Sequence, residues 1–167
     1  MQLRTLKKML CMFLVNKIFA ATDAYAIKRL LLRTAGYSIG EGTKVVGPLY
    51  CSTELSVGRN CWIDKNFMCN GNGSVEIGDN CDIGPEVTFQ TGGHSIGTAA
   101  RRAGKGLKFR QTVGVGTWIG GRVTVIGETS IGNSCVIAGC ACVIGDVSDN
   151  TVAGGVPAKA IKVLTDD

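Results

Sequence analysis

The stretch "VGVGTWIGGRVTVIGETSIGNSCVIAGCACV", residues 113–143, places an aliphatic residue at every sixth position. Glycine follows several of these residues, and the residue two positions before each is small or β-branched. A fixed short period of this kind is typical of a solenoid. The aliphatic positions of the same register, called anchors below, are Ile39, Val45, Cys51, Val57 and Ile63; Ile77, Ile83 and Phe89; and Val113, Ile119, Val125, Ile131, Ile137 and Val143.

The repeat also predicts how each unit is built. Side chains alternate between the two faces of a strand, so an anchor and the residue two positions before it face the same side. The period of six indicates that each short strand ends in a turn of fixed geometry. Glycine, Asn and Asp after the anchors tolerate the positive φ that such turns need. We therefore predict an all-β solenoid of about five turns, with the anchors inside. A different parallel solenoid and a β-sandwich are the alternatives.

Positive charge is concentrated at the start of the chain. The net charge is +5, and residues 1–34 carry seven Lys or Arg against the single Asp23. A nucleic-acid-binding domain would show its basic face across the whole body, so this class of function is not expected. Leu3, Leu6 and Leu10 follow helical spacing, and we predict a helical cap over residues 1–35. Peripheral contact of residues 1–34 with an anionic membrane is the alternative.

The cysteines do not indicate a metal site. Eight cysteines accompany one histidine, without a Cys-x-x-Cys pair or a cluster at zinc spacing. Cys61, Cys81 and Cys135 lie two positions before anchors, where a small buried hydrophobic residue is expected. Unpaired buried thiols are typical of a reducing compartment, so we expect a cytoplasmic protein, with the inner membrane face as a peripheral location.

The register breaks twice. The segment "NFMCNGNGS", residues 66–74, shifts it by two residues and is predicted to bulge as a loop. A longer excursion over residues 92–112 contains "RRAGKGLKFR", which is too polar for the interior and is predicted to protrude. The solenoid is then expected over residues 36–155, with a C-terminal tail over residues 156–167.

Several pieces resemble one family. "GGHS" at 92–95, the basic segment after it, "TWIGGRVTV" at 117–125 and "VAGGVPAKAIK" at 152–162 together resemble the hexapeptide-repeat acyltransferases, in the branch of galactoside, maltose and polysaccharide O-acetyltransferases. The resemblance implies a left-handed parallel β-helix. It also implies acetyl-CoA as co-substrate, no metal, a sugar or glycan acceptor, and a homotrimer with active sites between subunits.

The resemblance also implies roles for individual residues. His94, the only histidine, would be the general base, since an imidazole of ordinary pKa near 6.5 accepts a hydroxyl proton at neutral pH. Asn66 and Asp64 would bind the acceptor, although Asn66 also suits a turn. The coenzyme would lie along Trp118, Gly121 and Gly139, with Lys159 and Lys162 near its 3′-phosphate; for both lysines, exposed charges on a tail are the alternative.

These expectations converge on a function. We predict an acetyl-CoA-dependent O-acetyltransferase that modifies a sugar hydroxyl in capsule, exopolysaccharide or lipopolysaccharide assembly. The alternatives are a serine acetyltransferase, a nucleotide-sugar N-acetyltransferase and a non-catalytic β-helical scaffold subunit.

Overall fold

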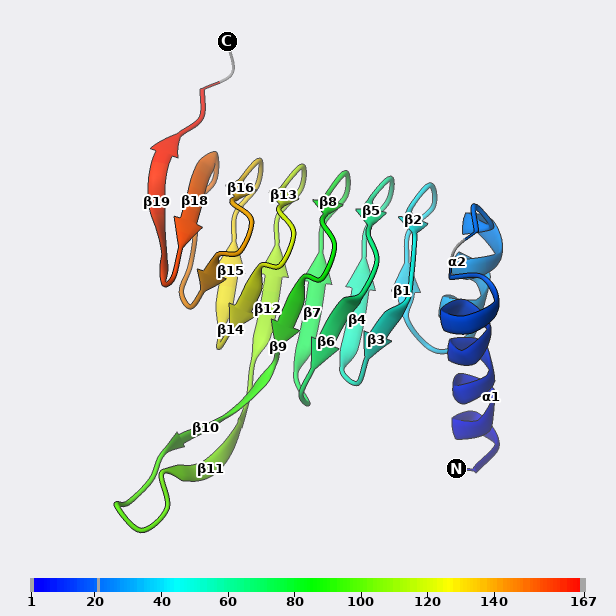
Figure 1. Cartoon of the computed structure of the whole chain (residues 1–167), viewed down its shortest axis with the longest axis horizontal. Coiled ribbons are helices and arrows are strands. Elements are labelled where there is room, and N and C mark those ends of the chain that lie inside the picture. Colours follow the sequence, from blue (N-terminus) through cyan, green and yellow to red (C-terminus); the bar gives the residue numbers. More distant parts are fainter. Residues whose placement is uncertain (1, 21, 166–167) are drawn as a thin grey trace.

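The computed structural model describes residues 2–20 and 22–165. They form a left-handed parallel β-helix of about six turns, preceded by short helices and interrupted by one hairpin that leaves the solenoid (Figure 1). This confirms the predicted fold class.

Three sheets form the walls of the solenoid, and the chain visits them in turn. The first sheet contains β1 (Ser38–Ile39), β4 (Glu54–Val57), β7 (Ser74–Ile77), β12 (Arg110–Val113) and β15 (Thr129–Ile131). The second contains β2 (Lys44–Val45), β5 (Trp62–Ile63), β8 (Asp82–Ile83), β13 (Trp118–Ile119), β16 (Val136–Ile137), β18 (Thr151–Gly155) and β19 (Ala158–Val163). The third contains β3 (Leu49–Cys51), β6 (Phe67–Asn70), β9 (Thr88–Gln90), β14 (Thr124–Ile126) and β17 (Cys142–Val143).

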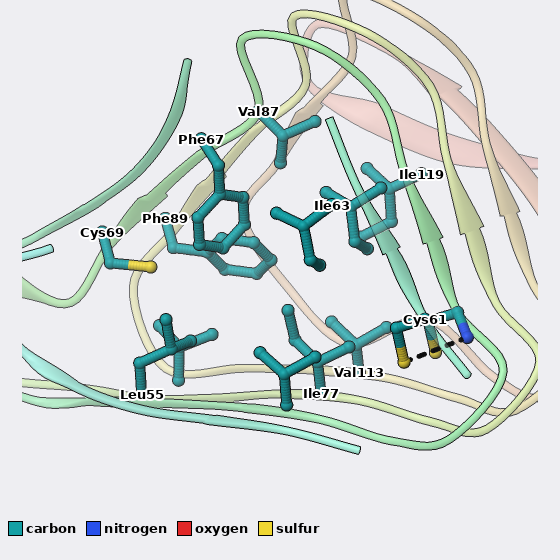
Figure 2. Packing of buried hydrophobic residues seen from close by; sticks show 14 of the residues in the cluster. Leu55, Cys61, Ile63, Phe67, Cys69, Ile77, Val87, Phe89, Val113 and Ile119 are labelled. Atoms are coloured by element: carbon teal, nitrogen blue, oxygen red, sulfur yellow. Dashed lines mark hydrogen bonds between the residues drawn. The ribbon is translucent and has the colours of Figure 1, made fainter. Parts of the chain in front are cut away.

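The anchors fill the interior, as the six-residue period predicts. All of them are buried except Cys51, which is half-buried, and they stack in register from turn to turn. Figure 2 shows aliphatic side chains from neighbouring turns packed around the rings of Phe67 and Phe89, whose centroids are 5.7 Å apart. Each turn covers its apolar side chains only by stacking on the next, which is how a solenoid gains its stability.

The cysteines at the predicted slot are buried. The thiols of Cys61, Cys81 and Cys135 each donate to a carbonyl of the following turn, those of Gly78, Gly114 and Ser148, at 3.1 Å in every case. All eight cysteines are free thiols. The thiol therefore serves as a small hydrophobic group that also satisfies a buried carbonyl.

The helices lie at the first turn. They are α1 (Gln2–Phe13), a π-helical turn η1 (Leu14–Ile18) and α2 (Tyr25–Thr34). Val15 and Leu32 are fully buried. The side-chain amide of Asn16 donates to the Leu49 carbonyl and accepts from the Leu49 N–H, at 2.8 and 2.9 Å, which ties the helices to β3. No helix in the described ranges is long and apolar enough to cross a membrane.

Three details differ from the sequence prediction. The solenoid has about six turns rather than five. Cys69, Val147 and Ala153 also contribute to the core, although they are not among the anchors of the six-residue register. Within the predicted loop 66–74, Phe67–Asn70 is strand β6, paired with β3 and β9, because Phe67 and Cys69 alternate inward. Much of the predicted tail is β19, which pairs antiparallel with β18; residues 166–167 lie outside the described residues.

Candidate active site

A hairpin carries the only histidine away from the solenoid. Strands β10 (Gly92–Ile96) and β11 (Ala103–Lys108) pair antiparallel and leave at the corner between β9 of the third sheet and β12 of the first (Figure 1). The predicted excursion is therefore an ordered hairpin, and its last predicted residues, 110–112, already belong to β12.

His94 lies on β10 with its side chain exposed. Its Nδ1 is 3.0 Å from the carbonyl oxygen of Gly104 on the opposite strand. A carbonyl can only accept, so the neutral imidazole must carry its proton on Nδ1, which leaves the lone pair on Nε2. Nε2 has no partner among the described residues. A ring fixed in this tautomer can accept a proton from a substrate hydroxyl.

The glycine before His94 packs under an aromatic ring. A Cβ at Gly93 would lie 2.8 Å from Cε2 of Phe109, the residue after β11. The phenyl ring therefore covers the backbone of β10 beside the histidine. A larger residue at this position would have to displace the ring.

The two predicted acceptor-binding residues lie at a different corner from the hairpin. Asp64 and Asn66 occupy the turn between β5 of the second sheet and β6 of the third. Asn66 has φ of 59°, and the same left-handed position is filled by Glu86, Arg122 and Cys140 in later turns. The conformation fits the turn role, and the structure does not bring Asn66 and His94 together within one chain.

Two amides that the six-residue period does not single out lie closer to the hairpin. Asn70 and Gln90 are in register at the ends of β6 and β9, immediately before the corner where β10 begins. Both point outward, since the residues before them, Cys69 and Phe89, are buried. Their alternation with Cys69 and Phe89 was the available signal, and it was hidden because 66–74 was interpreted as a loop.

The predicted coenzyme residues gather on the late turns of the second sheet. Trp118 is 57% exposed on β13. Gly121 and Gly139 lie in successive turns at its edge, where a Cβ on Gly139 would be 3.3 Å from the Gly121 carbonyl. Lys159 and Lys162 are exposed on β19, paired with β18 of the same sheet. The exposed indole and the bare glycine backbone leave this part of the surface open.

The hairpin is strongly basic. Arg101, Arg102, Lys105 and Lys108 are exposed and form no salt bridge within the described ranges. Arg110, where the chain rejoins the solenoid, instead binds both carboxylate oxygens of Glu76, at 2.9 and 2.7 Å. The guanidinium of Arg110 lowers the pKa of Glu76. The unpaired cations give the surroundings of His94 a positive potential, which favours an anionic ligand.

A polar groove of about 1010 Å³ lies between α1 and the first three turns. Its walls include the hydroxyls of Ser38, Ser56 and Ser74, the carboxylate of Glu54, and Asn72 at the corner that bears the hairpin. Such a lining suits a polyhydroxylated ligand. Among the residues that the structure describes, no three His, Cys, Asp or Glu side chains are placed to hold a metal ion.

The comparisons with known proteins agree with this geometry. The galactoside O-acetyltransferase of Escherichia coli (strain K12) is 33% identical over 138 residues, which cover 81% of this chain and 68% of that protein. A hexapeptide-repeat acetyltransferase of Vibrio cholerae solved with acetyl-CoA superposes with a TM-score of 0.82, at 26% identity, over 99% of this chain and 89% of the other.

A galactoside acetyltransferase solved with coenzyme A gives a TM-score of 0.77 at 27% identity, over 97% of this chain and 81% of the other. No model of a protein family matches the sequence. The repeat, the fold and these similarities agree, and the chain therefore belongs to the hexapeptide-repeat acyltransferases, as an acetyl-CoA-dependent acetyltransferase of the branch that contains the galactoside O-acetyltransferases.

Proposed function

We propose that this enzyme transfers the acetyl group of acetyl-CoA to a sugar hydroxyl, with His94 as the general base. The observation that carries the proposal is the hydrogen bond between Nδ1 of His94 and the Gly104 carbonyl. It selects the tautomer in which Nε2 can take a proton, on an exposed hairpin that a substrate can reach. The relatives named galactoside acetyltransferase support a sugar as the acceptor.

The proposed reaction is a direct transfer of the acetyl group from the thioester to the acceptor hydroxyl. Nε2 of His94 takes the hydroxyl proton while the acceptor oxygen bonds to the acetyl carbonyl carbon. The carbon–sulfur bond then breaks, and Nε2 returns the proton to the departing thiolate. Gly104 holds Nδ1–H throughout, so its carbonyl stabilises the transient imidazolium. Acetyl-CoA supplies a thioester reactive enough that no covalent enzyme intermediate is needed.

The acceptor is proposed to lie at the corner of the hairpin. Asn70 and Gln90 present amides there, and the polar groove reaches the same corner through Asn72. Amide groups bind sugar hydroxyls both as donors and as acceptors. Asp64 and Asn66 lie instead at the corner of Gly121 and Gly139, so any acceptor role for them requires a site assembled from more than one chain.

We propose a homotrimer, and the same separation supports a site shared between chains. Within one chain, His94 lies on the hairpin at the corner between the third and first sheets, whereas Trp118 lies on the second sheet and Gly121 and Gly139 at its edge. A neighbouring copy that places its own late turns beside the hairpin would complete the site. Ile96 on the hairpin is 90% exposed, which suits contact with another copy.

Peripheral membrane contact is proposed for the helices, with glycan assembly as the setting. Leu3, Leu6, Leu10 and Phe13 form one exposed apolar face of α1, and Lys7 beside them is also exposed. An apolar helix face bordered by lysines is typical of a helix lying on anionic lipid. A lipid-linked glycan would meet the enzyme at such a surface, which favours capsule, exopolysaccharide or lipopolysaccharide assembly.

The function is tested by incubating the purified chain with acetyl-CoA and a panel of methyl glycosides, maltose, serine and an amino sugar. Mass spectrometry then identifies the acetylated product. We expect O-acetylation of a glycoside. Transfer only to serine or to the amine would replace the proposal by the corresponding alternative, and the absence of transfer to any glycoside would overturn the proposed sugar acceptor.

A further inference from the structure

Gln111 is a long polar side chain inside the solenoid, where the other buried polar residues of the strands and turns are threonines. Its side chain lies on β12 and is fully buried. Figure 2 shows aliphatic and aromatic residues of the interior into which it points. The positions in register with it in the other turns of the first sheet hold Val75, Leu55 and Thr129. The glutamine thus occurs in the one turn that carries the hairpin.

The amide of Gln111 is used asymmetrically. Its Nε2 donates to the carbonyls of Gln90, Val125 and Gly127, at 3.1, 3.2 and 2.8 Å. Three surrounding carbonyls can only accept, so they fix the orientation of the amide. Its Oε1 is buried without a partner among the described residues. The unpaired oxygen lowers stability, whereas the nitrogen satisfies carbonyls at the corner of the hairpin, so the amide serves this corner through its nitrogen alone.

The contact to Gln90 joins the two ends of the hairpin insertion. Gln90 is the last residue of β9, and Thr91 alone separates it from β10. Gln111 lies on the returning side, three residues after β11 ends at Lys108. Its buried side chain therefore reaches the carbonyl from which the outgoing strand departs.

Thr91, the residue after Gln90, is also held by hydrogen bonds. Its N–H donates to the Asn70 carbonyl at 2.7 Å, its carbonyl accepts from the Phe109 N–H at 2.8 Å, and its hydroxyl lies 3.3 Å from that of Thr53. The side chain is fully buried. Thr91 and Gln111 are thus two buried polar residues at the root of the hairpin. Thr91 lies three residues before His94.

We propose that Gln111 is a positioning residue for His94. By holding the Gln90 carbonyl from inside the core, it sets the direction in which β10 leaves the solenoid and keeps Nδ1 of His94 against the Gly104 carbonyl. The inference rests on the proposed role of His94 as base.

The test compares Gln111→Met with Thr129→Val. Methionine keeps the length of the side chain without the amide, and Thr129 occupies the same slot in the next turn, away from the hairpin. Thermal unfolding reports stability. Acetyl transfer to methyl β-galactoside gives kcat and the KM for acetyl-CoA, and ¹⁵N NMR of the one imidazole reports the tautomer of His94.

For Gln111→Met we expect lower thermal stability, because the carbonyls of Gln90, Val125 and Gly127 lose a donor. We also expect a kcat lowered about tenfold or more, an unchanged KM for acetyl-CoA, and ¹⁵N signals averaged between the two tautomers. Thr129→Val should keep the wild-type kcat and tautomer. The proposal is overturned if Gln111→Met keeps both the kcat and the Nδ1–H tautomer of the wild type, or if Thr129→Val loses as much kcat.

If Gln111→Met does not fold, Gln111→Val, which copies the residue of the preceding turn, takes its place with the same expectations. The two proposals fail separately. Full activity of a His94→Ala variant would remove His94 as the base, whereas the ¹⁵N signals of the Gln111 variants still decide whether Gln111 orients the ring.

Discussion

Replacing Leu6 and Leu10 of α1 by glutamine should weaken binding to anionic vesicles. Both side chains lie on the exposed face of α1, with exposed fractions of 64% and 58%. Complete burial of a leucine contributes about 1.5–3 kcal/mol, so burying the exposed parts of both contributes about 1.8–3.7 kcal/mol. The expected loss of affinity is about 20- to 500-fold. Glutamine has a helix propensity close to that of leucine, so α1 should persist.

The assay is sedimentation with sucrose-loaded vesicles of phosphatidylglycerol and phosphatidylcholine. Ile161 and Val163 on β19 are exposed to a similar degree, at 64% and 71%, at the other end of the solenoid. Their replacement by glutamine is the matched control and should leave vesicle affinity unchanged. Binding should also fall with added salt, since each lysine near an anionic surface contributes about 1 kcal/mol.

Equal vesicle affinity of the wild type and the Leu6→Gln, Leu10→Gln variant would refute the assignment of this face to lipid. A change in oligomeric state of that variant, measured by light scattering without a change in vesicle affinity, would assign the face to contact between copies instead.

Three further predictions concern the solenoid and its assembly. Phe89→Ala should lower the free energy of unfolding by about 3–5 kcal/mol in urea titrations, because the ring is fully buried against Phe67; a loss below about 1 kcal/mol would contradict this packing. Arg110 lowers the pKa of Glu76, so their ion pair stabilises the fold above the ordinary pKa of 4.5, and this contribution is lost as the pH falls through the lowered value. Glu76→Gln should therefore be less stable than the wild type at neutral pH and equally stable in acid; a constant difference in stability at all pH values would contradict the assignment. Light scattering should give three times the mass of one chain, and a monomer that is active would contradict a site shared between copies.

The repeat made most of the fold predictable. A period of six with small inward residues identifies both the wall of each turn and the direction of its side chains, and Ile83, Ile119 and Ile137 lie buried in register as that period requires. Strand β6 was missed because the prediction relied on aliphatic anchors followed by glycine. Phe67 and Cys69 point inward without either feature, so tertiary stacking on β3 and β9 decided the conformation.

The site was predictable only in part. His94 was identifiable because it is the one histidine and lies where the repeat stops. The contact of its Nδ1 with Gly104 was not, because it depends on the pairing register of a hairpin with a local irregularity after His94. Gln111 lay in the region expected to protrude, and only the structure shows its side chain inside the core.

The most direct test of the mechanism is the turnover of a His94→Ala variant with acetyl-CoA and methyl β-galactoside, compared with that of the wild type. If His94 is the general base, kcat should fall about 10²- to 10⁴-fold while the KM for acetyl-CoA and the thermal stability stay the same. A variant that keeps the wild-type kcat would show that another group removes the hydroxyl proton.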